Sequence, residues 1–136
     1  MQKWLVPFVV ALSVIAAVVR VEAHAFLIRA EPRVGSKVNK APTEVRVWFS
    51  ETVQAGVSSI KVFDVSGKQV DKKDTHSDRA DRADRAVLCV SLLPALTPGT
   101  YKVVWRVTSA DTHVTNGDFR FQFLGTQRAA VSSHAK

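Results

Sequence analysis

The 136-residue chain has few of the residues that cross-link a fold or bind soft metal ions. It contains one cysteine, Cys89, and one methionine, Met1. A single cysteine excludes an internal disulfide. Cys89 lies in the apolar run AVLCVSLL, where it is best explained as a strand residue that packs like a small hydrophobic side chain. No second cysteine supports the alternative, a metal thiolate.

Helical periodicity is also absent after residue 23, and the hydrophobic pattern has a period of two. In TEVRVWFS (43–50) Val45, Val47 and Phe49 share one face, with Glu44, Arg46 and Trp48 on the other, and YKVVWRVT (101–108) and DFRFQFLG (118–125) show the same period. Such alternation is typical of half-buried strands. Turn sequences such as EPRVGS, KAPTE, SGK, LTPGT and TNGD separate the runs. We therefore predict an all-β domain of about seven strands, an antiparallel sandwich or barrel; the other strands are expected at 25–30, 57–64 and 86–93, with a short one at 68–70.

The first 23 residues have the layout of a secretory signal peptide. Lys3 precedes an apolar run at 4–19, and Val21 and Ala23 occupy the −3 and −1 positions of a small-residue cleavage site. The alternative is an uncleaved anchor, but sixteen residues fall short of the about 20 that span a membrane. We predict cleavage after Ala23, a β domain at 24–125 and a flexible tail at 126–136. With no second apolar span, the mature protein should be soluble outside the cytoplasm.

The chain is basic without a nucleic-acid signature. Its formal net charge is +7, and loss of Lys3, Arg20 and Glu22 with the signal peptide would lower it to +6. Such a charge would attract an anionic surface or serve solubility alone. No cluster of base-stacking aromatic residues interleaves with the basic ones, so nucleic-acid binding is not expected. The triplet repeat DRADRADRA at 78–86 is read as a solvated loop, with one or two helical turns as the alternative; it is assigned no chemistry.

Four histidines are the candidates for chemistry, and two stand out. His76, in a charged loop, and His134, in the tail, are interpreted as exposed polar residues. His113 lies in TSADTHVTNGD, directly after a strong strand, and loops at strand ends often carry function. Asp111 and His113 are two apart, so in an extended backbone they project to one side. Alone, the D-x-H pattern is a weak signal.

His24 strengthens that signal because cleavage after Ala23 would make it the first residue. Its α-amine, with a pKa of about 7.7–8.0 when unbound, and its imidazole can close a chelate ring on a metal. Together with His113 and the Asp111 carboxylate they form a tetragonal set of three nitrogens and one oxygen. That set suits Cu(II), whereas Zn(II) prefers tetrahedral geometry and Cu(I) prefers the methionine and cysteine ligands that this chain lacks.

Three segments resemble the CopC family of periplasmic copper-binding proteins: HAFLIRAEPRVGS, APTEVRVWFSETV and LTPGTYKVVWRVTSADTHVTNGDFRFQF. The resemblance implies a Greek-key sandwich or barrel of cupredoxin-like or immunoglobulin-like type. It implies one Cu(II) per chain, bound by His24 with its amine, Asp111 and His113. The methionine-rich Cu(I) loop of some members is missing, so a Cu(II)-only version is expected.

The resemblance also implies a role and a partner. We expect a monomeric periplasmic carrier or buffer for copper that is not an enzyme and that works with a CopD-like inner-membrane protein. Import, resistance and storage stay open. Glu51 is either a group that supports the site or a solvent-facing strand end. The alternative function is a lytic polysaccharide monooxygenase-like enzyme, which also uses an N-terminal histidine; the chain is short for that role, and Asp111 would fill a position that oxygen needs.

Overall fold

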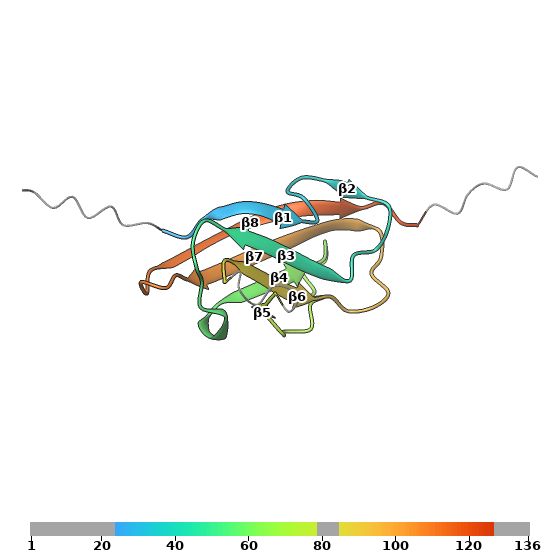
Figure 1. Cartoon of the computed structure of the whole chain (residues 1–136). Coiled ribbons are helices and arrows are strands. Elements are labelled where there is room, and N and C mark those ends of the chain that lie inside the picture. Colours follow the sequence, from blue (N-terminus) through green and yellow to red (C-terminus); the bar gives the residue numbers. More distant parts are fainter. Residues whose placement is uncertain (1–23, 79–84, 127–136) are drawn as a thin grey trace, which may run out of the picture.

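The computed structural model describes residues 24–78 and 85–126, which form two packed β-sheets (Figure 1). The described part contains eight strands and one short 3₁₀ turn, η1 (Ala55–Val57). The strands are β1 (Leu27–Glu31), β2 (Lys37–Val38), β3 (Glu44–Phe49), β4 (Ser59–Phe63), β5 (His76–Ser77), β6 (Val87–Ser91), β7 (Gly99–Thr108) and β8 (Val114–Phe123).

The first five strands alternate between the two sheets along the chain, after which β6 joins the sheet of β5, and β7 and β8 both join the other sheet. One sheet has the order β1-β3-β6-β5 and the other the order β2-β8-β7-β4. Every pairing is antiparallel except β2 with β8, which is parallel. The predicted all-β sandwich is therefore confirmed. The strand count exceeds the expected seven because β2 and β5 were not foreseen: two residues are too short to show a period.

The alternation read from the sequence places the core correctly. Inward-facing residues of β3, β7 and β8 are at most 7% exposed. Aromatic pairs join the two layers and neighbouring strands: the rings of Phe49 and Trp105 meet edge to face at 5.3 Å, and those of Tyr101 and Phe121 stack at 5.4 Å. Burial of each large apolar side chain contributes about 1.5–3 kcal/mol. The inward set of these three strands is Val45, Val47, Phe49, Tyr101, Val103, Trp105, Val107, Phe119, Phe121 and Phe123.

The turn expected at TNGD is wrong, because Asn116 and Gly117 lie inside β8. Gly117 pairs with Trp105 on β7, and a Cβ atom at Gly117 would lie 2.6 Å from Cζ2 of the indole. The glycine thus provides space for a tryptophan and makes no turn. The chain reverses earlier, at residues 109–113, where the sequence holds no glycine.

Three other sequence predictions meet a mixed outcome. No strand forms at 68–70; only an isolated bridge joins Gln69 to Phe63. Cys89 is buried, as expected, and burial is the main cause that raises its pKa to about 11. His76, expected in an exposed loop, is half-buried in β5, with Nδ1 2.6 Å from the carbonyl oxygen of Asp74.

Three segments lie outside the described residues: 1–23, most of the triplet repeat (79–84) and 127–136. Within the described part, no helix is long and apolar enough to cross a membrane.

Candidate metal centre

The structure brings His24 and His113 together at one end of the sandwich. Their ring centroids are 5.2 Å apart and the rings meet edge to face. The two residues come from opposite parts of the chain, His24 from the segment before β1 and His113 from the loop between β7 and β8. Figure 1 shows the start of the β1 segment and the β7–β8 loop at the same end of the molecule.

His24 is held in place by the two residues that follow it. Ala25 is fully buried, and its carbonyl oxygen accepts a hydrogen bond from Oγ1 of Thr115 on β8 at 2.5 Å. The amide of Phe26 donates to Oγ of Ser50 at 3.0 Å, and the amide of Ser50 donates to the Phe26 carbonyl at 2.9 Å. The backbone directly after His24 is therefore fastened to both sheets, while the His24 side chain itself is exposed.

The hairpin loop between β7 and β8, residues 109–113, presents Asp111 and His113. The Ser109 amide donates to the His113 carbonyl at 2.9 Å, and the Thr112 amide donates to the Ser109 carbonyl at 2.9 Å. These bonds close a four-residue turn over 109–112 whose last residue lies in the left-handed region, a feature of common hairpin connections. That residue is Thr112, with φ of 73°. A β-branched side chain in this region is unusual and strained, and such strain is often found at functional sites.

The loop is also tied to the segment that follows β3. The Ala110 amide donates to the Thr52 carbonyl at 3.0 Å, and the Gln54 side-chain amide donates to the Ser109 carbonyl at 3.0 Å. The Gln54 backbone amide donates to Thr108 at 2.8 Å. These bonds join the β7–β8 loop to the segment after β3, which is a strand of the other sheet. The positions of Asp111 and His113 are therefore set by both sheets.

Asp111 is engaged at both of its oxygens. Oδ1 accepts a hydrogen bond from the hydroxyl of buried Ser109, and Oδ2 lies 3.0 Å from Nδ1 of His113. The Ser109 hydroxyl first, and His113 second, lower the pKa of Asp111 to about 2. Asp111 is thus a carboxylate at any physiological pH. Because Nδ1 of His113 faces Asp111, Nε2 is the ring nitrogen on the side away from the carboxylate.

The remaining candidates lie apart or stay untested. His76 is in β5, at the far edge of the sheet from β1. His134 lies outside the described residues. Glu51 follows Ser50 at the end of β3 and is half-buried, so its supporting role stays a prediction. Sequence reasoning missed Ser109 and Ser50, which position the candidate ligands; neither stands in a pattern that distinguishes it from any other loop serine.

The described side chains form only part of a metal site. Within residues 24–78 and 85–126, no three His, Cys, Asp or Glu side chains are arranged to hold a metal ion. The structure pairs His24 with His113 and His113 with Asp111, which are nitrogen and oxygen donors of the type that suits Cu(II). A further donor is needed to complete the set. The nitrogen of His24 is the nearest in sequence, but in the uncleaved chain it is a peptide nitrogen.

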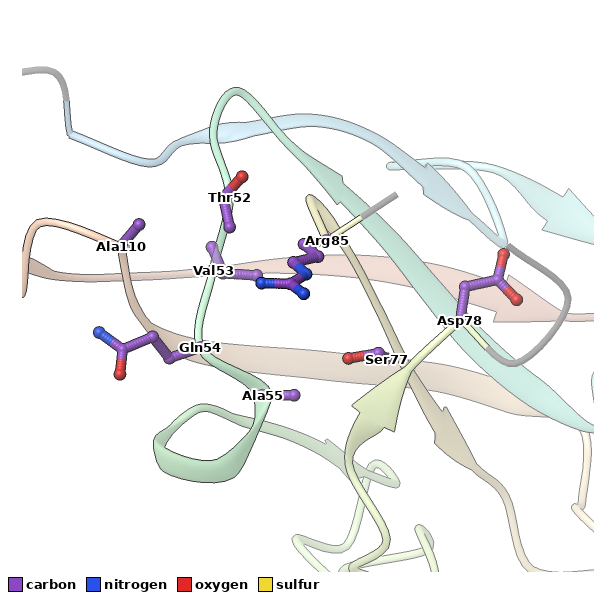
Figure 2. A pocket seen from close by; sticks show the side chains of 8 residues that line it. All are labelled: Thr52, Val53, Gln54, Ala55, Ser77, Asp78, Arg85 and Ala110. Carbon is purple, nitrogen blue, oxygen red and sulfur yellow. The ribbon is translucent and has the colours of Figure 1, made fainter. Parts of the chain in front are cut away.

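A separate pocket lies beyond the Thr52–Ala110 contact. It has a volume of about 660 Å³. Figure 2 shows the Arg85 guanidinium group and the Ser77 hydroxyl turned toward the chain between Val53 and Ala55. None of the three candidate ligands lines this pocket. The candidate ligands lie outside this pocket, at the surface of one end of the sandwich. An ion at that position would be held by surface side chains.

The fold and this rim define the class: a small two-sheet β domain with a candidate surface site for a metal ion. The chain belongs to the CopC domain family, whose model matches residues 27–123. The family predicted from the sequence is thereby confirmed.

Named relatives agree with this assignment. The chain is 30% identical over 123 residues to the copper transport protein CutJ of Bacillus subtilis, covering 82% of this chain but only 21% of that one. It thus spans about a fifth of CutJ. The crystal structure of CopC from Methylosinus trichosporium matches with a TM-score of 0.69 and 28% identity, covering 77% of this chain and 98% of that one. PcoC of Escherichia coli, described as a methionine-rich copper resistance protein, matches with a TM-score of 0.64 and 28% identity, covering 74% and 99%.

Proposed function

We propose that this protein is an exported Cu(II)-binding protein that carries or buffers copper. The observation that carries the proposal is the 5.2 Å approach of the His24 and His113 rings, in a family whose relatives include a copper transport protein and a copper resistance protein. Each of the two rings is presented by backbone fixed to both sheets, so the pair is preorganised for a ligand rather than produced by a mobile loop.

The N-terminal amine is the donor that would complete the site. In this proposal, residues 1–23 are a signal peptide, 24–125 the copper-binding domain and 126–136 a tail. Cleavage after Ala23 changes the His24 nitrogen from a peptide nitrogen into an amine. The amine and ring of His24 would chelate one Cu(II), and His113 and Asp111 would fill the other two equatorial positions. Nitrogen and oxygen donors in a tetragonal set favour Cu(II).

Asp111 has two tasks in this proposal. Before copper arrives, its carboxylate orients the His113 ring through Nδ1, at 3.0 Å. A carboxylate that hydrogen-bonds a metal-binding histidine fixes the ring and raises its basicity. The carboxylate cannot hold Nδ1 and coordinate an ion on Nε2 at the same time, so in this proposal it leaves the ring when copper binds and supplies one oxygen ligand. The low pKa of Asp111 means that no proton must leave the carboxylate first.

The wider role follows from the relatives. PcoC is described as methionine-rich, whereas the only methionine here is Met1; a Cu(I) site of thioethers is therefore excluded after cleavage, and we assign Cu(II) alone. In CutJ the matched segment is a fifth of a longer chain, so there a domain of this kind is covalently joined to further sequence. For this chain we propose a separate partner, a CopD-like inner-membrane protein, with the carrier acting as a periplasmic monomer.

No observation favours the monooxygenase alternative. CutJ is named for copper transport and PcoC for copper resistance, and in the proposed ligand set Asp111 would occupy a position that an oxygen-activating site needs open. We assign no enzymatic step to this chain.

The proposal is tested by copper titration against a competing chelator, with two proteins that differ by one residue. The first begins at His24, and the second carries one additional residue before it. We expect one Cu(II) per chain and a large loss of affinity in the extended form, because the amine is displaced from the ring. Equal affinities would remove the amine from the site.

A matched pair of histidine variants tests the side-chain ligands. His113→Ala should weaken Cu(II) binding strongly, and His76→Ala should not, since His76 lies in β5 away from the loop. The reverse order would show that the ligand assignment is wrong.

A further inference from the structure

The two outer faces of the sandwich differ in charge. On the outer face of the β1-β3-β6-β5 sheet, cations have partners: Arg46 lies 3.0 Å from Glu44 and 3.4 Å from Asp78, and Arg29 lies over the Trp48 ring at 3.8 Å. The outer face of the other sheet carries five cations and one acid. We call these five residues the basic face: Lys37, Lys61, Lys102, Arg106 and Arg120, with Asp118 as the acid among them.

The strand register places all five cations on the same side. On β4, β7 and β8 they alternate with buried residues, and Lys37 pairs in parallel with Gln122, which also faces outward. In the described part of the chain, none of the ion pairs reaches these five side chains. The basic face therefore carries a net positive charge, and the acids beside it are Asp118 on β8 and Asp64 next to Lys102 and Arg120.

One position in this face points to an anionic ligand. Lys102 and Arg120 are directly opposite each other on β7 and β8. Like charges in such a cross-strand pair destabilise a sheet unless something neutralises them. Both residues line a hollow of about 420 Å³. The hollow also contains Asp64, but its Oδ1 accepts hydrogen bonds from Ser66 and from the Lys68 amide within its own turn.

We propose that the basic face docks on an anionic phospholipid surface, with the lipid phosphates beside Lys102 and Arg120. The cations are spread over all four strands of a broad sheet, which matches a plane of phosphate groups better than a point-like ligand. Protein interfaces usually depend on aromatic side chains that anchor the partner, and single-stranded nucleic acid is bound by aromatic side chains that stack on its bases. The aromatic residue among the outward positions of this face is Phe63, and it is half-buried. The face therefore suits neither kind of partner as well as it suits a lipid surface.

Docking in this way would leave the histidine pair accessible. His113 follows the end of β7, whereas Lys102 and Arg120 lie near the opposite end of the hairpin. The inference does not depend on copper, so it can be tested on metal-free protein.

The test is co-sedimentation of the protein with vesicles. One set contains phosphatidylglycerol and phosphatidylcholine, and the other contains phosphatidylcholine alone. All variants share one N-terminus, so its contribution cancels. Each cation near an anionic membrane surface strengthens binding about fivefold. Lys102→Gln with Arg120→Gln should therefore bind the anionic vesicles roughly 30-fold more weakly than wild type, and added salt should reduce wild-type binding.

The matched control is Lys40→Gln with Lys72→Gln. It removes the same net charge from the loops before β3 and β5, outside the basic face, and should bind nearly like wild type. A second pair on the face, Lys61→Gln with Arg106→Gln, should repeat the loss if the first pair fails to fold by circular dichroism. Equal losses in control and face variants, equal binding to both vesicle types, or binding to duplex DNA but not to vesicles would each overturn the proposal.

Discussion

Gly117→Ala tests whether β8 accommodates the Trp105 ring as the structure shows. The added Cβ would lie 2.6 Å from Cζ2 and 2.9 Å from Cε2 of the indole. The ring cannot easily move away, because Trp105 is only 7% exposed and packs edge to face on Phe49 at 5.3 Å. Overpacking of this kind costs about 1–3 kcal/mol. Replacing glycine also restricts the unfolded chain, which offsets about 0.4–1 kcal/mol.

The net expectation is a loss of roughly 1–2 kcal/mol in the free energy of unfolding. Urea denaturation followed by tryptophan fluorescence measures it. Gly56→Ala is the matched control: it lies in η1, and a Cβ there meets no atom within 4 Å. The control should be neutral or slightly stabilised. If Gly117→Ala were as stable as Gly56→Ala, then the close approach of Gly117 to the indole, and with it the register of β7 and β8, would be wrong.

Three further predictions concern the loop and the core. Ser109→Ala should lower Cu(II) affinity about 10–100-fold, since loss of a residue that positions a ligand usually has that effect. Unchanged affinity in a chelator competition would show that the Ser109–Asp111 hydrogen bond does not contribute to copper binding. Thr112→Gly should raise the free energy of unfolding by up to about 1 kcal/mol, because it relieves a threonine at φ of 73°; a lower denaturation midpoint would contradict the strain. Cys89 should react with a thiol reagent far more slowly in native buffer than in urea, since burial raises its pKa to about 11; rapid native labelling would show that it is accessible.

Much of the fold could be predicted because its long strands carry a clear period. Val45, Val47 and Phe49 on β3 were assigned to the core from alternation alone, and they are buried. The short strand β5 could not be found in this way, because two residues have no period. The Asn116–Gly117 dipeptide led to the wrong prediction of a turn. This dipeptide is common in hairpin turns, but here Gly117 packs closely against an indole ring.

The candidate site was harder to read than the fold. A separation of two residues placed Asp111 and His113 on the same side of an extended chain, but the loop is a hairpin turn, and their contact arises from that turn. Nothing in the periodicity of the sequence brings His24 near His113; the predicted cleavage after Ala23 and the donor set that Cu(II) prefers suggested the pairing, and the family resemblance supported it. The serine that fixes Asp111 is buried inside a loop, where sequence patterns give no warning.

In this structure, folding and the proposed metal chemistry are separable. The buried core consists of apolar side chains from both sheets and includes none of the candidate ligands, and the backbone after His24 is fixed by hydrogen bonds from Phe26 and Thr115. That distinguishes the domain from small metal-dependent folds, in which binding energy is folding energy. Cleavage before His24 would therefore change the donor set while the core and both sheets stay as they are. Copper affinity can then depend on processing, and removal of copper should leave the sandwich folded.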